Sequence, residues 1–198
     1  MTRLDRGLAA CRRGLFILLL GALVATFGVT TVGIDGDSMA PTLRDGERAW
    51  VPRYETWWHR AGQGSWAQGD IVYFLAPGTV PRTWLDRVVG GPFLIKRVVA
   101  VAGQSVELRR GRLWLDGGEA PEAYLDGATV TVINRAPEVV PPGHLYVLGD
   151  NRSPLASRDS RAFGPVPIEL VAGRASWVVW PWWRLDEDAA WRWNVRRL

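Results

Sequence analysis

The strongest pattern along the chain is an uninterrupted apolar stretch near its start. Residues 14–34 contain no charged side chain. A helix of that length could cross the roughly 30 Å hydrocarbon core of a bilayer. Arginines precede the stretch, and Asp35 and Asp37 follow it. Because cytoplasmic flanks carry the excess of basic residues, the pattern predicts a transmembrane anchor at 14–34, with residues 1–13 in the cytoplasm and residues 35–198 outside.

A cleavable signal peptide is the alternative interpretation of this stretch. Its apolar core would be shorter, and a small-x-small cleavage site would follow it. The run here is longer than that, and no clean site of this kind follows it. The pattern therefore favours an uncleaved anchor.

From residue 35 onward, short runs of branched and aromatic residues alternate with Gly, Pro and Asp turns, which is typical of β-strands. The predicted strands are Arg48–Val51, Ile71–Leu75, Phe93–Val101, Ser105–Arg109, Arg112–Leu115, Thr129–Ile133, His144–Leu148 and Val171–Val179. The predicted fold class is therefore mainly β, a single β domain with one N-terminal transmembrane helix. Residues 53–68 and 76–92 are rich in Gly, Pro, Trp and Arg, and we expect surface loops there.

The C-terminal end is the one place after the anchor where the pattern allows a helix. It also holds six of the twelve tryptophans, between Trp177 and Trp193, mixed with Pro181, Arg184 and Arg192. Indole rings favour the headgroup layer of a bilayer. We therefore expect this end of the outer domain to contact the membrane.

Composition narrows the possible functions. The chain has 198 residues, which suits one compact domain with appendages. Its net charge of +4 is small and dispersed, so nucleic acid is not an expected partner. Cys11 is the only cysteine, so an intrachain disulfide and a cysteine-rich metal site are excluded. No metal or other cofactor is expected.

One residue count points to chemistry. The chain has 23 arginines but a single lysine, Lys96. Arginine stays protonated, whereas a desolvated lysine can lose its proton and act as a base. In the predicted strand Phe93–Val101, Lys96 shares a face with Leu94, Val98 and Ala100. That apolar setting would lower the pKa of the amine. A coding bias that replaces lysine with arginine is the alternative explanation.

Four short segments follow the apolar stretch in a fixed order. They are Gly36–Leu43 (GDSMAPTL), Gly69–Phe74 (GDIVYF), Leu94–Gln104 (LIKRVVAVAGQ) and Gly149–Arg152 (GDNR) with Ser157–Arg161 (SRDSR) after it. Each alone is a modest signal. Together, behind an N-terminal anchor, they resemble type I signal peptidase, the bacterial leader peptidase, over nearly the whole chain.

The resemblance implies a membrane-bound serine endopeptidase that removes N-terminal signal peptides from exported preproteins. Its partners would be preprotein signal peptides and the lipid bilayer, and the enzyme would be a monomer. Ser38 matches the nucleophile and Lys96 the general base. Met39 matches a conserved substrate-binding methionine, Ser157 a serine that hydrogen-bonds the lysine, and Asp159 and Arg161 a supporting ion pair.

Two departures from the family pattern affect the site. Gly36 stands where some relatives have a serine whose hydroxyl adds to the oxyanion hole, which leaves the Ser38 N–H as the one assigned donor. Four residues, 153–156, separate the Gly-Asp-Asn-Arg block from Ser157, where the family usually has two. If that loop is rearranged, Ser153 or Ser160 could take the place of Ser157.

Two other functions remain open from the sequence. One is a related Ser/Lys processing peptidase of a conjugation system, which would share the dyad and the export route. The other is a membrane-tethered β-domain that binds partners without catalysis. Such a binding module would not need both Ser38 and Lys96.

Overall fold

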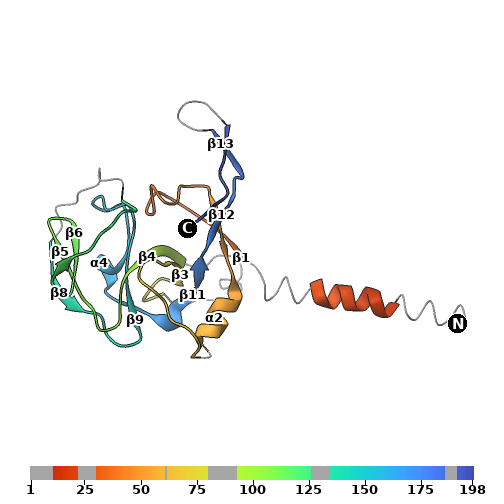
Figure 1. Cartoon of the computed structure of the whole chain (residues 1–198), viewed down its shortest axis with the longest axis horizontal. Coiled ribbons are helices and arrows are strands. Elements are labelled where there is room, and N and C mark those ends of the chain that lie inside the picture. Colours follow the sequence, from red (N-terminus) through yellow and green to blue (C-terminus); the bar gives the residue numbers. More distant parts are fainter. Residues whose placement is uncertain (1–10, 22–29, 61, 80–92, 126–133, 186–190) are drawn as a thin grey trace, which may run out of the picture.

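The computed structural model describes residues 11–21, 30–60, 62–79, 93–125, 134–185 and 191–198. Most of these residues lie in or between β-strands, which confirms the predicted mainly β fold (Figure 1). The helices within these ranges are residues 11–21, α2 (Arg53–Arg60), α4 (Ser160–Phe163) and the 3₁₀ turn η1 (Ile168–Leu170). In the described ranges, no helix combines the length and the apolar character needed to cross a bilayer.

The central element is a five-stranded antiparallel sheet in the order β10-β9-β4-β3-β11. Its strands are β3 (Ile71–Leu75), β4 (Phe93–Val101), β9 (His144–Leu148), β10 (Val166–Pro167) and β11 (Val171–Ala175). The middle strand β4 is buried at six consecutive positions, because apolar clusters pack on both of its faces. This strand carries Lys96.

The predicted alternation along β4 holds only up to Val98. Leu94 and Val98 pack in one apolar cluster, as expected. A register shift between Val98 and Ala100 then turns Ala100 into a different cluster, beside Val99. The prediction that Ala100 shares the face of Lys96 was therefore wrong, because a bulge adds a residue to the strand.

A second sheet, in the order β1-β2-β12-β15, contains the first and the last strand of the described residues. Its strands are β1 (Thr30–Gly33), β2 (Arg48–Val51), β12 (Trp177–Trp180) and β15 (Arg196–Arg197). The sequence pattern places residues 30–34 in the transmembrane anchor. In the structure, Thr30–Gly33 pair with β2, and Ile34 is buried in the core. The apolar stretch therefore continues into the folded domain.

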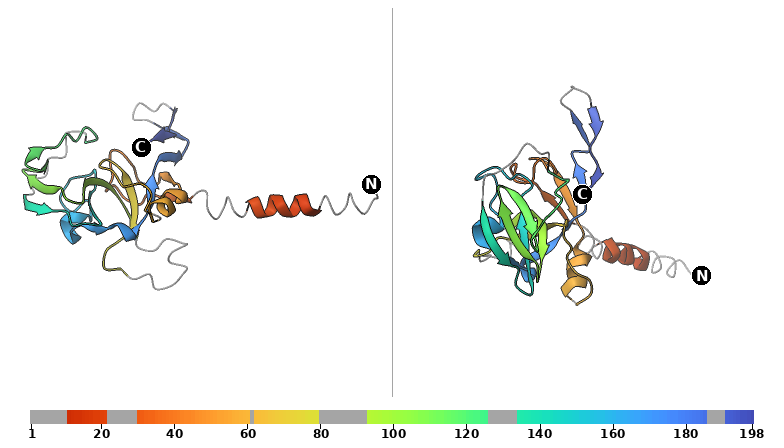
Figure 2. Two further views of the ribbon diagram at one scale, coloured as in Figure 1. Left: turned by 60° about the horizontal axis from the view of Figure 1, so that its bottom comes forward. Right: turned by 60° about the vertical axis from the view of Figure 1, so that its left-hand side comes forward.

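The remaining strands form a third sheet and a separate hairpin. The third sheet has the order β7-β6-β5-β8, from β5 (Ser105–Arg109), β6 (Arg112–Leu115), β7 (Gly118–Glu119) and β8 (Arg135–Val139). The hairpin pairs β13 (Trp183–Leu185) with β14 (Trp191–Trp193) and projects from the domain (Figure 2). The helix that the sequence allowed near the C-terminus is therefore a strand pair.

Two other details of the sequence prediction change. Residues 53–60 form α2 rather than part of a loop, and the predicted strand Val171–Val179 is divided between β11 and β12. Contacts with β11 stabilise helix α2: Thr56 Oγ1 donates to Ala172 O (2.7 Å), and Arg174 forms an ion pair with Glu55 (2.7 Å). The predicted strand Thr129–Ile133 and residues 80–92 of the predicted loop lie outside the described residues.

Candidate active site

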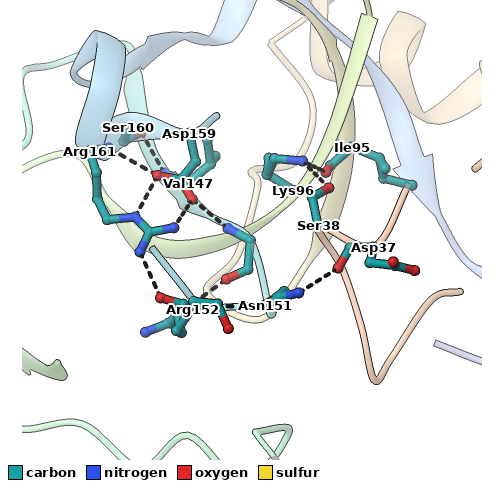
Figure 3. Close-up of polar contacts among 12 residues, drawn as sticks. Asp37, Ser38, Ile95, Lys96, Val147, Asn151, Arg152, Asp159, Ser160 and Arg161 are labelled. Carbon is teal, nitrogen blue, oxygen red and sulfur yellow. Dashed lines mark hydrogen bonds and ion pairs between the residues drawn. The ribbon is translucent and has the colours of Figure 1, made fainter. Parts of the chain in front are cut away.

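Ser38 and Lys96 meet although 57 residues separate them in the chain. Ser38 lies in the loop between β1 and β2, and Lys96 lies on β4. Lys96 Nζ donates hydrogen bonds to Ser38 Oγ (2.7 Å) and to Ile95 O (2.7 Å), as Figure 3 shows. Hydroxyl and amine are thus in position for direct proton transfer.

The surroundings of Lys96 lower the pKa of its amine. Its side chain is 2% exposed. Burial is the largest influence and lowers the pKa from 10.5 to about 8; Asp159 and Asp150 oppose the shift, while Arg161 assists it. Because the ammonium loses its water shell, a useful share of the amine is neutral near neutral pH.

The loop after β9 hydrogen-bonds to the backbone at Ser38. Asn151 donates from its backbone N–H to Ser38 O (3.1 Å) and from Nδ2 to Asp37 O (3.1 Å). Gly149 approaches so closely that a Cβ there would lie 2.5 Å from Ser38 O and 2.7 Å from Ser157 Cβ. Only glycine fits without a shift of the backbone, so the size of residue 149 helps to set the position of Ser38.

A buried ion pair fastens this loop to β4. Arg97 donates to both carboxylate oxygens of Asp150, at 2.9 and 2.6 Å, and also to Gly69 O (2.9 Å). Its guanidinium stacks over the Tyr124 ring at 4.1 Å. Sequence reasoning assigned no role to Arg97 or to Asp150. The sequence feature that could have revealed Arg97 is its permanent positive charge in the middle of a largely apolar strand.

Asp159 and Arg161, expected as a supporting pair, form an ion pair of 2.8 Å. Asp159 is completely buried, which alone would raise its pKa. Arg161 and the Gly149 N–H (2.9 Å) outweigh burial and hold the pKa of this carboxyl below its ordinary value. The charged Asp159 thereby joins α4 to the loop that contacts the Ser38 backbone (Figure 3).

Ser157 lies close to the dyad but does not make its predicted contact. Lys96 donates to Ser38 and Ile95, and the buried Ser157 Oγ has no hydrogen-bond partner among the described residues. The hydroxyl contributes to the lowered pKa of Asp159, but its contact with that carboxylate falls outside hydrogen-bond geometry. A buried hydroxyl without a protein partner is a place where an ordered water can bind.

The two alternative serines have other positions. Ser160 Oγ accepts the Val147 N–H (2.9 Å), which ties α4 to β9. Ser153 contacts Asn151 through its backbone N–H, which donates to Asn151 Oδ1 (3.1 Å).

Gly36 occupies the position where some relatives have a serine that adds to the oxyanion hole. Its backbone N–H donates to Asp45 Oδ1 (2.6 Å), so in this arrangement the Gly36 amide does not point to an oxyanion.

Beside the dyad, β4 leaves part of one edge open. Residues 93–97 pair with β3, but β9 pairs with β4 only from Arg97 onward. On the β9 side, Phe93–Ile95 therefore have no partner strand within the described ranges. Extended peptides bind to edges of this kind through main-chain hydrogen bonds. Met39 is fully buried in the core cluster with Leu43 and Ile95, so its contact with substrate stays a prediction.

A family model and the similar sequences indicate one family. A family model described as "Signal peptidase, peptidase S26" matches residues 8–180. Signal peptidase IB of Staphylococcus aureus is 33% identical over 184 residues, which cover 84% of each chain. A probable signal peptidase I-1 of Synechocystis sp. is 32% identical over 164 residues, covering 83% of this chain and 78% of the relative. A crystal structure of a signal peptidase I from Enterococcus faecalis covers 57% of this chain and 98% of its own, with 29% identity and a TM-score of 0.43.

Proposed function

The chain belongs to the signal peptidase family, peptidase S26, and we propose that Ser38 is its nucleophile and Lys96 its general base. The protein is a serine endopeptidase that removes signal peptides from preproteins. The observation that carries the residue assignment is the 2.7 Å contact between the buried Lys96 amine and the Ser38 hydroxyl. One chain supplies both groups, so we propose that it acts as a monomer.

The reaction follows from this geometry. Neutral Lys96 takes the proton of Ser38 as Oγ attacks the scissile carbonyl, and the carbonyl electrons move to its oxygen. The Ser38 N–H is the proposed donor to this oxyanion. When the C–N bond breaks, the Lys96 ammonium returns its proton to the departing amine. Lys96 then activates a water molecule that hydrolyses the acyl-enzyme and regenerates Ser38.

Asp159, Arg161 and Ser157 support the dyad in this proposal. The Asp159–Arg161 pair fixes the loop at Gly149, and that loop touches Ser38. Ser157 offers a buried hydroxyl beside the dyad, where it can take up a hydrogen bond as Lys96 changes its protonation state. Preorganised groups of this kind need no rearrangement during the reaction.

We propose that the signal peptide binds as an extended strand along the open edge of β4 at Phe93–Ile95. The dyad lies at the end of that edge, so the scissile bond would reach Ser38. Small side chains are expected at the first and third positions before the cut, with Met39 behind the pocket nearest to it. Cleavage of a model preprotein, followed by N-terminal sequencing of the product, tests this. A product cut after bulky residues as readily as after Ala would contradict it.

The pH dependence of cleavage should show the protonation state of Lys96. The base must be neutral, so kcat/KM of the full-length enzyme should rise with pH and level off above about 8. Below that value the rate should fall about tenfold per pH unit. A pH series with a peptide substrate measures this limb. A midpoint near 6.5, the ordinary value of histidine, would instead indicate a different base.

For the N-terminus we propose a membrane anchor that ends before β1. The uncharged residues 14–29 would lie in the bilayer, residues 1–13 in the cytoplasm, and the catalytic domain from Thr30 to Leu198 outside. As a helix, these 16 residues span about 24 Å, so the bilayer would thin locally or the arginines before the segment would snorkel to the headgroup layer. The distribution of charges supports this orientation, because Arg12 and Arg13 precede the segment while Asp35 and Asp37 follow the first strand.

This topology predicts where an external protease can act. Protease added to intact spheroplasts should digest the catalytic domain, while a tag placed before residue 14 should survive until the membrane is permeabilised. Immunoblots against both ends measure the outcome. Full protection of the domain in intact spheroplasts would reverse the orientation.

The Trp-rich hairpin is our proposed second contact with the bilayer. Opposite residues in β13 and β14 share a face, so Trp183 and Trp193 lie on the same side as Leu185 and Trp191. All four are at least half exposed, between 51% and 70%. Arg184 lies on the other side, where its guanidinium is 4.0 Å from Glu47. The hairpin thus presents its apolar face away from the domain.

Labelling can test this contact in the full chain. In a Cys11→Ser background, Leu185→Cys carries an environment-sensitive fluorophore in reconstituted vesicles. Its emission should shift to the blue and be quenched by lipids with nitroxide-labelled acyl chains. Val139→Cys is the matched control, because Val139 is 62% exposed on β8 in a different sheet. Equal quenching of both labels, or of neither, would contradict the proposal.

A further inference from the structure

The last five residues of the chain return to the loop that carries Ser38. We call Asn194–Leu198 the C-terminal strap. Strand β15 within it pairs with β12, and the Leu198 N–H donates to Ser176 O (3.0 Å). The Leu198 side chain packs against the core cluster that contains Met39 and Leu43. In Figure 1 the C-terminus accordingly lies beside the sheet rather than on the projecting hairpin.

Arg196 is the centre of the polar contacts in the strap. Its Nη1 donates to Glu47 Oε1 (3.0 Å) and to Asn194 Oδ1 (2.5 Å). Its Nη2 donates to Glu47 Oε2 (2.8 Å) and to Thr42 O (2.8 Å). The planar guanidinium thus contacts a carboxylate and a backbone carbonyl at once, which requires the fork of donors that arginine alone provides.

Glu47 is the residue of the loop that most needs this cation. It is 2% exposed. Burial alone would raise its pKa, but Arg196 and the Arg44 N–H (3.1 Å) outweigh burial, and the pKa lies below its ordinary value. Asn194 Nδ2 also donates to Glu47 Oε1 (3.2 Å). A buried carboxylate is tolerated only with partners of this kind, so loop and strap depend on each other.

Thr42 connects the strap to the catalytic base. Its carbonyl accepts from Arg196, and its Oγ1 accepts from Arg97 Nη2 (3.3 Å). Arg97 follows Lys96 directly on β4. The loop between β1 and β2 is therefore held on one side by the strand of the base and on the other by the C-terminal strap, four residues after Ser38.

We infer that Arg196 is a positioning residue, through which the C-terminal strap holds the Ser38 loop at hydrogen-bond distance from Lys96. The inference rests on the proposed roles of Ser38 and Lys96. The strap lies beyond residue 180, where the match to the family model ends. This chain thus uses a segment outside the matched region to fix the geometry of its dyad.

A purely structural role would differ from a positioning role in two measurable ways. If Arg196 only stabilised the fold, its loss would lower Tm, but the folded fraction would keep the kcat and pH profile of the parent. If Arg196 positions the loop, the Ser38–Lys96 contact loosens and water reaches the amine. The acidic limb of kcat/KM then moves to higher pH, toward the ordinary lysine value.

The test compares Arg196→Ala, Arg196→Lys and Arg197→Ala in the full-length enzyme with a peptide substrate. Both Arg196 variants should lower kcat by about 10- to 100-fold with KM changed by less than about threefold, and should shift the acidic limb upward. Arg196→Lys keeps a cation near Glu47, so it should fold even if Arg196→Ala does not, yet its point charge lacks the fork. Arg197 is the matched control, because it is the exposed neighbour in β15; its variant should behave as the parent.

Parent-like kcat and pH profile in folded Arg196→Lys would overturn the inference, as would equal losses in Arg197→Ala. Failure of the proposed function would be recognised separately. In that case Ser38→Ala would keep its activity in the same assay, whatever the Arg196 variants do.

Discussion

Lys96→Arg should eliminate cleavage, with kcat lowered by about 10⁴- to 10⁶-fold, while the protein still folds and inserts. Arginine keeps the positive charge and the length of the side chain, but its guanidinium does not release a proton near neutral pH. The substitution therefore removes the base with little change in shape. Turnover of a model preprotein, with circular dichroism as the check on folding, measures the effect.

Ser38→Ala and Lys96→Ala are the matched comparisons. Each should be as inactive as Lys96→Arg, and the double variant should be no worse than either single one, because residues that act as a unit lose their function together. Measurable turnover by Lys96→Arg would show that another group removes the serine proton. Additive losses in the double variant would indicate that the two side chains act independently.

Gly149→Ala should reduce kcat by about 100-fold or more and lower the free energy of unfolding by about 1–3 kcal/mol. The added methyl would overlap Ser38 O, Ser157 Oγ and Ser157 Cβ, so the backbone of one loop must move. Because Ser38 O is one of these atoms, the movement displaces the nucleophile. Steady-state kinetics and urea unfolding of the purified variant measure both effects.

Gly33→Ala is the control for Gly149→Ala, since a Cβ at Gly33 meets nothing within 4 Å. It should keep parent kcat and stability. Adding Ser157→Gly to Gly149→Ala removes two of the three overlapping atoms and should restore part of the lost stability. If Gly149→Ala is as active as the parent, the loop does not set the position of Ser38.

Sequence reasoning succeeded for strands with regular alternation or continuous apolar runs. The predicted bounds of β2, β3, β4, β5, β6 and β9 match the structure. Strand β8 was not predicted. All five of its residues are exposed, so its sequence shows no alternation of buried and exposed positions. Helix α2 is only eight residues long, a length at which helices depend on tertiary contacts.

The site shows the same division between local and tertiary information. Motif spacing identified Ser38 and Lys96, and the structure places them in contact. Asn151 and Arg97 were missed because their importance lies in contacts with Asp37 O and Asp150, which no local pattern reveals. Arg196 is 154 residues from Thr42 in sequence, so only the fold could show that they touch.

The burial of Lys96 also determines how the stability of the fold depends on pH. The exposed amine of the unfolded chain titrates near 10.5, whereas in the folded state the pKa is about 8. Below pH 8 the ammonium is charged in both states, and the folded state carries the whole desolvation cost, about 3 kcal/mol. Between pH 8 and 10.5 the unfolded chain holds a proton that the folded chain has released, so this cost shrinks as the pH rises. The residue that makes the enzyme active thus weakens its fold most at neutral and acidic pH, and an uncharged side chain of similar size would give a more stable but inactive protein.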